Sequence, residues 1–199
     1  MNYSQRKDPW VVCKMPVSFK QKLGLEGVVS WAKTWKADVV IGQFEPEDDV
    51  AIFRRNGIIA LAQDHVSRFS QIPNITGEYI KTGQMAADHF LNRKFEYFGF
   101  FGYNGVCWSD ERCEGFRRRI QEAGFGQNLY VYDKQNIDNI WYYDPSELQD
   151  WLMSLPKPIA IMARDDNQGN LLIQACQVCG FKIPFDVAII GVDNDEILC

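Results

Sequence analysis

The sequence predicts an α/β fold in which parallel sheets are flanked by helices. The expected strands are short, continuous apolar runs, and they alternate along the chain with segments of helical apolar spacing. Strands buried on both faces have continuous apolar runs, and regular alternation with helices is typical of parallel sheets. With 199 residues, of which 46% are hydrophobic, the chain is long enough for one large or two small domains.

Each expected strand is an apolar run bounded by polar or turn-forming residues. The first, Trp10-Val-Val-Cys13, is expected to be short and buried. The full set is expected at residues 10–13, 37–42, 58–62, 74–76, 97–101, 129–132, 158–162 and 187–191.

The expected helices combine apolar residues at helical spacing with recognisable ends. Gly57, Gly124 and Gly180 each follow a periodic segment, and glycine is the residue most often found just after a helix. Pro145 stands in a first turn, where its missing N–H costs nothing. The helices are expected at residues 25–36, 47–56, 78–93, 109–123, 145–153 and 166–179.

These elements form two successive groups, and the glycine-bearing loop 102–105 is the natural crossing point between them. We therefore expect an N-terminal lobe at residues 1–102 and a C-terminal lobe at residues 103–199. No low-complexity segment or long linker separates them.

The composition argues against several classes of function. A net charge of −5 does not suit a chain that grips nucleic-acid phosphates by itself. No run of eighteen apolar residues and no signal-peptide pattern occurs, so neither a membrane span nor a membrane partner is expected. Neither a GxGxxG nor a GxxxxGKS/T motif is present, so no cofactor is expected.

The six cysteines are expected to be reduced and mostly buried rather than paired in a disulfide framework. Cys176 and Cys179 form a single CxxC within a helical pattern, and the chain has only two histidines. A zinc site needs a second ligand pair at close spacing, so no metal site is expected. Without an activated nucleophile, metal or cofactor cradle, the sequence does not indicate an enzyme.

Polar residues follow several of the expected strands, and ligands of open α/β sheets bind beyond the carboxyl ends of strands. Trp108 and Arg112 follow strand 97–101, Asp165 follows strand 158–162, and Asp193 follows the last strand. The candidate ligand-binding residues are Trp108, Asp110, Arg112, Asp165, Asp193 and Asn194.

This set of side chains suits a neutral ligand with many hydroxyl groups. Carboxylates accept hydrogen bonds from hydroxyls, and arginine donates a rigid fork to adjacent oxygens. A tryptophan face stacks on the apolar C–H face of a sugar.

Each candidate also has a purely structural alternative. Trp108 fills a core in one alternative, and Arg112 pairs with Glu111 or Glu114 at the surface in another. Asn194 belongs to a solvated turn in a third. Ser109 and Asp166 are the expected N-cap residues of their helices, which leaves Asp165 to face a ligand.

Three segments, residues 108–116, 155–163 and 187–199, together resemble the sensor domain of xylose-operon regulators. These transcription factors carry a lac-repressor-like effector domain of the periplasmic-binding-protein type I fold, followed in the family by an AraC-type helix-turn-helix domain. The resemblance covers almost the whole chain. It implies a two-lobed type I fold that is incomplete at both ends, with the DNA-binding domain absent.

The resemblance also implies roles for individual residues. Arg112 resembles the arginine that binds sugar hydroxyls, Asp193 resembles a cleft aspartate, and Asp165 takes the place of a cleft asparagine. Glu78 and Tyr79 stand where the family usually has Asp-Asn.

By this resemblance the chain is the sugar-sensing part of a cytoplasmic regulator of sugar catabolism. A pentose such as xylose is expected to bind between the lobes, operator DNA to bind through the missing C-terminal domain, and a homodimer is allowed. The alternative is a periplasmic sugar-binding protein of a transporter, and an α/β enzyme is a further rival.

Overall fold

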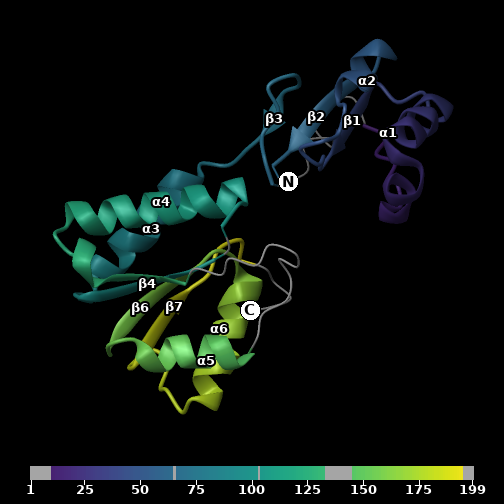
Figure 1. Ribbon diagram of the computed structural model, residues 1–199. Coiled ribbons are helices and arrows are strands. Elements are labelled where there is room, and N and C mark those ends of the chain that lie inside the picture. Colours follow the sequence, from purple (N-terminus) through teal and green to yellow (C-terminus); the bar gives the residue numbers. More distant parts are fainter. Residues whose placement is uncertain (1–9, 65, 103, 133–144, 195–199) are drawn as a thin grey trace. The chain divides into compact units, whose positions relative to one another are not determined.

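Two parallel β-sheets, each with helices packed on it, organise the chain (Figure 1). The computed structural model describes residues 10–64, 66–102, 104–132 and 145–194, so residues 195–199 of the last family-like segment lie outside it. The strand orders are β1-β2-β3 and β5-β4-β6-β7, and every neighbouring pair is parallel. The predicted class, parallel sheets flanked by helices, is confirmed.

The first unit consists of residues up to 63 together with residues 69–75. Helices α1 and α2 pack on one face of its sheet through Val28, Ala32 and Phe53, which meet Ala60 of β2 in a common core. Its elements are α1 (Val17–Thr34), β1 (Val39–Gly42), α2 (Ala51–Arg55), β2 (Ile59–Gln63) and β3 (Asn74–Ile75).

The other face of this sheet is exposed. Val39, Ile41 and Ile59 are 42%, 54% and 59% accessible, and they alternate with the buried side chains along the same strands. The expectation of helices on both faces therefore does not hold for the first sheet within the described residues.

The expected strand at residues 10–13 is wrong. This segment has no regular structure, and Trp10, Val11 and Val12 are 65%, 89% and 83% exposed. An apolar run forms a strand only where a neighbouring strand accepts its backbone hydrogen bonds. Helix α1 also begins eight residues earlier than expected, at Val17, and bends at Gly24, which has a φ of 61°.

The second unit consists of residues 64–68 and residues from 76 onward. Its elements include one short 3-10 turn, η2 (Gly126–Asn128). The others are α3 (Tyr79–Asn92), β4 (Tyr97–Phe101), α4 (Cys107–Glu122), β5 (Leu129–Tyr132), α5 (Pro145–Ser154), β6 (Ile159–Ala163), α6 (Asp166–Val178) and β7 (Val187–Ile190).

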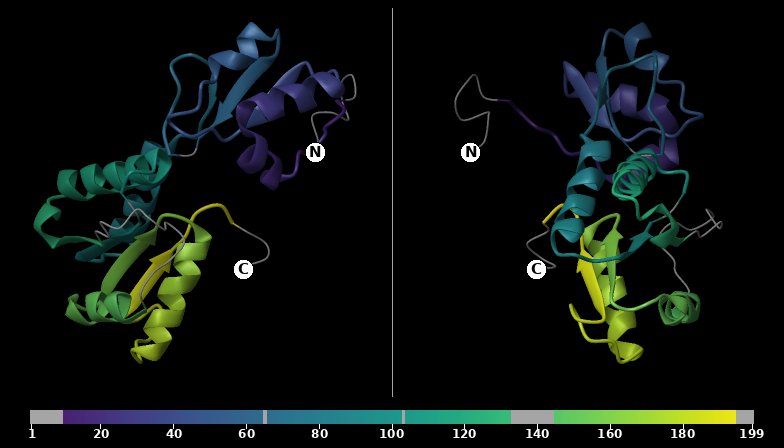
Figure 2. Two further views of the ribbon diagram at one scale, coloured as in Figure 1. Left: turned by 45° about the vertical axis from the view of Figure 1, so that its right-hand side comes forward. Right: turned by 90° about the vertical axis from the view of Figure 1, so that its left-hand side faces the viewer.

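Helices cover both faces of the second sheet (Figures 1 and 2). On one face α3 and α4 pack through Phe90 and Phe116 onto Phe98 and Met162. On the other face α5 and α6 pack onto the alternate residues of the same strands. The continuous apolar runs of β4 and β6 are explained by this double burial.

The division of the chain differs from the boundary expected between residues 102 and 103. Strand β4 lies in the same sheet as β5, β6 and β7, and α3 packs against α4, so residues 76–102 belong with the C-terminal elements. The expected boundary rested on the glycine-bearing loop 102–105, but β4 and α4, on either side of it, lie in the same unit.

Helices α3 and α4 cross at two glycines with their backbones in contact. A Cβ added to Gly83 would lie 2.6 Å from the backbone nitrogen of Phe116, and one added to Gly115 would lie 2.7 Å from the carbonyl carbon of Ile80. Both distances are shorter than real Cβ contacts allow, and a backbone cannot rotate away as a side chain can. Glycine is therefore required at both positions for this crossing.

We predict that Gly83→Ala lowers the free energy of unfolding by about 2–3 kcal/mol, because the added methyl group overpacks the crossing. The measurement is chemical denaturation. The matched control is Gly169→Ala in α6, where the nearest atoms would lie 3.8 and 3.9 Å away. This control should be neutral or stabilising by up to about 1 kcal/mol, because alanine is the better helix former. Equal effects of the two substitutions would contradict the proposed backbone contact.

Candidate functional site

Arg112 lies at the centre of a group of polar side chains at the carboxyl ends of β4, β6 and β7. It is only 7% exposed although it carries a full charge. Its Nη1 donates to the carbonyl oxygen of Arg164, and its Nη2 lies 3.3 Å from Oδ1 of Asp193. Neither Glu111 nor Glu114 is its partner, so the alternative of a surface ion pair on α4 is wrong: Glu111 pairs with Arg68, and Glu114 with two other arginines.

Two aromatic rings flank the Arg112 guanidinium. Its central carbon lies 5.2 Å from the centre of the Tyr79 ring and 5.1 Å from that of the Trp108 ring. Tyr79 is the first residue of α3, and Trp108 lies in the first turn of α4, so the Gly83–Gly115 crossing brings these rings to the same arginine. Stacking on rings limits the planes that a guanidinium can adopt and so orients its N–H donors.

A second arginine is buried beside the first. Arg164 follows β6 and is 1% exposed; its Nε lies 3.1 Å from Oδ2 of Asp165. Its guanidinium carbon lies 5.1 Å from the centre of the Trp108 ring, at the same distance as that of Arg112. Trp108 therefore contacts two cations and is partly buried. It is neither a fully buried core residue nor a fully exposed stacking surface.

Asp165, not Asp166, is the N-cap residue of α6. Its backbone is extended, with φ −153° and ψ 174°, and its Oδ1 accepts from the backbone N–H of Gln168 at 2.8 Å. An N-cap must have non-helical backbone angles, whereas Asp166 is already the first residue of the helix. The carboxylate of Asp165 thus serves the helix start and Arg164 together.

Ser109 is not the N-cap of α4, because the helix begins two residues earlier, at Cys107. Val106 occupies the cap position and makes no side-chain cap bond. Ser109 instead lies inside the helix, 1% exposed, with its hydroxyl directed at Gly102.

Asp193 and Asn194 follow β7 with left-handed backbone angles, at φ of 100° and 53°. Such angles are costly for residues other than glycine, and aspartate and asparagine tolerate them best. The Asp193 side chain is 57% exposed and reaches Arg112 from this turn. Asn194 is exposed, as expected for a turn residue.

Asp110 contacts a loop rather than the Arg112 group. Its Oδ2 accepts from the backbone N–H of Gly105 at 3.1 Å, which closes the loop before α4. Partial burial raises the pKa of this carboxyl, and the Gly105 bond opposes that rise.

Three buried polar atoms at this edge of the sheet have no hydrogen-bond partner among the described residues. They are Nε of Arg112, Oγ of Ser109 and Oε1 of Gln168. Buried polar groups are almost always paired with protein, water or ligand. The Arg112 Nε can therefore donate a hydrogen bond to a ligand, and the Ser109 and Gln168 oxygens can accept one.

Sequence reasoning missed Tyr79, Arg164 and Gln168. Arg164 directly follows β6, a position that the strand-end rule marks. Tyr79 begins α3, a position that the family resemblance marks. Gln168 is one residue of a polar helix start, and nothing in its sequence context separates it from a surface residue.

No group of three or more His, Cys, Asp or Glu in the part of the chain that the structure describes is placed to hold a metal ion. The cysteines described there form no disulfide, and burial raises the pKa of Cys113 and of Cys176 to about 11. None of the described helices is both long and apolar enough to cross a membrane.

The chain matches the model of a known protein family. Residues 87–198, more than half of the sequence and most of the second unit, match the periplasmic binding protein-like domain. The chain belongs to this family.

Individual relatives of this periplasmic binding protein-like chain include transcriptional regulators. The xylose operon regulatory protein of Escherichia coli K12 is 26% identical over 83% of the chain, and the chain spans only 44% of that relative. A solved structure of the xylose-binding transcription activator xylR matches with a TM-score of 0.63 and 19% identity, over 92% of this chain and 53% of that one.

A third similar structure is a periplasmic binding protein/LacI transcriptional regulator from Alkaliphilus metalliredigens in complex with D-xylulofuranose. It has a TM-score of 0.66 and 16% identity, and the match covers 86% of this chain and 64% of that one. These likenesses show the expected lac-repressor-like type I fold, of which the chain represents a part. The AraC label that the resemblance implied is corrected, because the relatives are LacI-like.

We predict that Asp165→Ala lowers the free energy of unfolding by at least about 1 kcal/mol, through loss of the N-cap and of the carboxylate beside Arg164. Asp166→Ala, which leaves the cap in place, should cost clearly less. Chemical denaturation of both variants is the measurement. A larger decrease in the free energy of unfolding for Asp166→Ala than for Asp165→Ala would indicate that Asp166 is the cap.

Proposed function

We propose that this chain is the sugar-sensing part of a transcriptional regulator, and that Arg112 is the principal donor to the sugar hydroxyls. The observation that carries this proposal is the state of the Arg112 guanidinium. It is buried and flanked by Tyr79 and Trp108, and its Nε has no hydrogen-bond partner within the described part of the chain. A charged group held in this way is ready to donate without reorganisation, which is how a binding site reduces its ordering cost.

The charges around Arg112 favour a neutral ligand. Two guanidiniums, of Arg112 and Arg164, lie beside two carboxylates, of Asp165 and Asp193. A neutral sugar leaves this balance unchanged, whereas an ionic ligand would add an uncompensated charge to a largely buried group. Hydroxyls both donate and accept, so one sugar can use Arg112 and Asp193 at the same time.

Trp108 has two roles in this proposal. Its ring orients the Arg112 guanidinium, and its exposed part offers a surface for the C–H face of a sugar. Asp165 acts mainly through Arg164, Asn194 borders the site, and Asp110 supports the preceding loop.

D-Xylose is the first ligand to test. This choice rests on the relatives, which include regulators named for the xylose operon and a structure named as xylose-binding. Operator DNA is then the partner of a DNA-binding part of a longer cytoplasmic protein, and a homodimer is the form we expect to bind it. Enzymatic activity forms no part of the proposal.

We predict that Arg112→Lys weakens the binding of D-xylose to the intact protein by about 30-fold, corresponding to about 2 kcal/mol for a lost charged hydrogen bond. Lysine keeps the charge but loses the planar fork and the ring contacts. Isothermal titration calorimetry is the measurement, and Arg118→Lys is the control, since Arg118 is an exposed residue of the same helix.

A thermal-shift screen of neutral pentoses and hexoses and of one sugar acid should accompany the calorimetry. Stabilisation by a neutral pentose is expected. Stabilisation by the acid alone would replace the neutral-sugar proposal with an anionic ligand, and unchanged affinity in Arg112→Lys would remove Arg112 from the site.

A further inference from the structure

We propose that Arg68, far from Arg112 in the sequence, is a positioning residue of the candidate site. It holds Asp64, Val66 and Thr76 against the first turn of α4 and thereby fixes Trp108 and Arg112. This inference rests on the proposed function, because its main readout is sugar affinity. We call Asp64, Arg68, Thr76 and Glu111 the Arg68 clasp.

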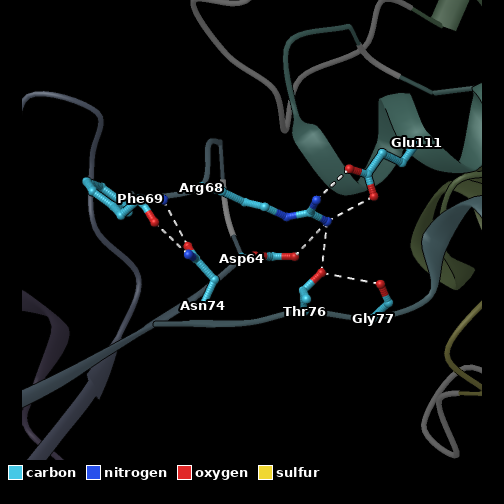
Figure 3. A network of polar contacts seen from close by, with 7 residues as sticks. All are labelled: Asp64, Arg68, Phe69, Asn74, Thr76, Gly77 and Glu111. Carbon is cyan, nitrogen blue, oxygen red and sulfur yellow. Dashed lines mark hydrogen bonds and ion pairs between the residues drawn. The ribbon is translucent and has the colours of Figure 1, made fainter. Parts of the chain in front are cut away.

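The side chain of Arg68 joins Asp64, Thr76 and Glu111, which all belong to the second unit (Figure 3). Its Nη2 donates to Oγ1 of Thr76 at 2.8 Å and to Oε2 of Glu111 at 2.9 Å, and its Nη1 lies 2.8 Å from Oε1 of Glu111. The pair with Glu111 is thus bidentate, the strongest geometry for an arginine and a carboxylate. Its hydrogen bonds to Glu111 raise the pKa of Arg68.

Arg68 also compensates a buried charge. The Asp64 side chain is 1% exposed, and its Oδ2 lies 3.5 Å from Nη2 of Arg68. Its Oδ1 has no hydrogen-bond partner among the residues that the structure describes. A buried carboxylate needs a nearby cation, and Arg68 is the cation placed to serve it. Residues 64 and 68 are therefore tied to each other as well as to α4.

The backbone at Val66, two residues from both Asp64 and Arg68, supplies a cap for α4. The helix has no side-chain cap, and the backbone N–H of its first residue, Cys107, donates to the carbonyl oxygen of Val66 at 3.1 Å. The first N–H groups of any helix need such partners. The clasp thus holds the helix start from two sides, through Glu111 and through Val66.

Glu111 and Thr76, the two residues of the clasp that Arg68 bonds most closely, each lie near a residue of the Arg112 group. Glu111 precedes Arg112 directly, and Trp108 lies three residues before Glu111, on the same face of α4. Thr76 lies three residues before Tyr79, whose ring contacts the Arg112 guanidinium. Residues 69–75, which belong to the first unit, are closed separately by Asn74, which bonds the backbone N–H and carbonyl of Phe69 (Figure 3).

The decisive variants are Arg68→Lys and Glu111→Gln. Lysine keeps a positive charge beside Asp64 but lacks the planar fork whose two nitrogens make the bidentate pair with Glu111. Arg118→Lys is the matched control, because Arg118 pairs with Glu114 at 3.5 Å on the exposed side of the same helix. Two measurements are needed, calorimetry with D-xylose and amide hydrogen exchange without ligand.

We expect Arg68→Lys and Glu111→Gln each to weaken D-xylose binding by roughly tenfold, with no further loss when combined, since both break the same pair. Amides of residues 107–110 should exchange faster in both variants, and the melting temperature should change little because the pair is partly exposed. The Arg118→Lys control should match wild type in every measurement.

Wild-type affinity and wild-type exchange at residues 107–110 in Arg68→Lys would overturn the proposal, as would an equal loss in Arg118→Lys. Failure of wild-type protein to bind any sugar would instead count against the proposed function. In that case the exchange measurement still decides whether Arg68 holds the start of α4.

Discussion

The backbone contact between α3 and α4 at Gly83 and Gly115 is the constraint on which the site depends. It brings the start of α3, with Tyr79, to the first turns of α4, with Trp108 and Arg112. Any side chain at either glycine would push the helices apart and open the space around the guanidinium. The Arg68 clasp acts on the same region by securing the first turn of α4.

The sequence predicted most of the fold because its signals are local. The apolar runs at 97–101 and 158–162 correctly located β4 and β6, and Gly57, Gly124 and Gly180 correctly located the ends of α2, α4 and α6. Helix α1 is the exception, because it begins eight residues before the expected start. The segment at 10–13 failed because strand formation needs a partner, which its own composition does not reveal. The boundary at 102–103 failed because sheet membership of β4 is a non-local property.

The candidate site was predictable in part. The strand-end rule singled out Trp108, Arg112, Asp165 and Asp193, and the structure brings these four together with Arg164. It could not assign roles, since whether Asp165 or Asp166 caps α6 depends on one residue of helix register. Tyr79 contacts Arg112 from 33 positions away in the sequence, and Arg68 bonds Glu111 from 43 positions away. Such distant contacts become visible only in the folded chain.

The central claim is that Arg112 binds a neutral sugar through donors fixed by its surroundings. Its most direct test is a side-chain NMR titration of the intact protein with D-xylose, in which the Nε–H signal of Arg112 is identified by its loss in Arg112→Lys. We predict a saturable shift of this signal with the dissociation constant measured by calorimetry, because no described residue accepts a hydrogen bond from this donor. Sugar binding that leaves the signal unmoved would contradict the account.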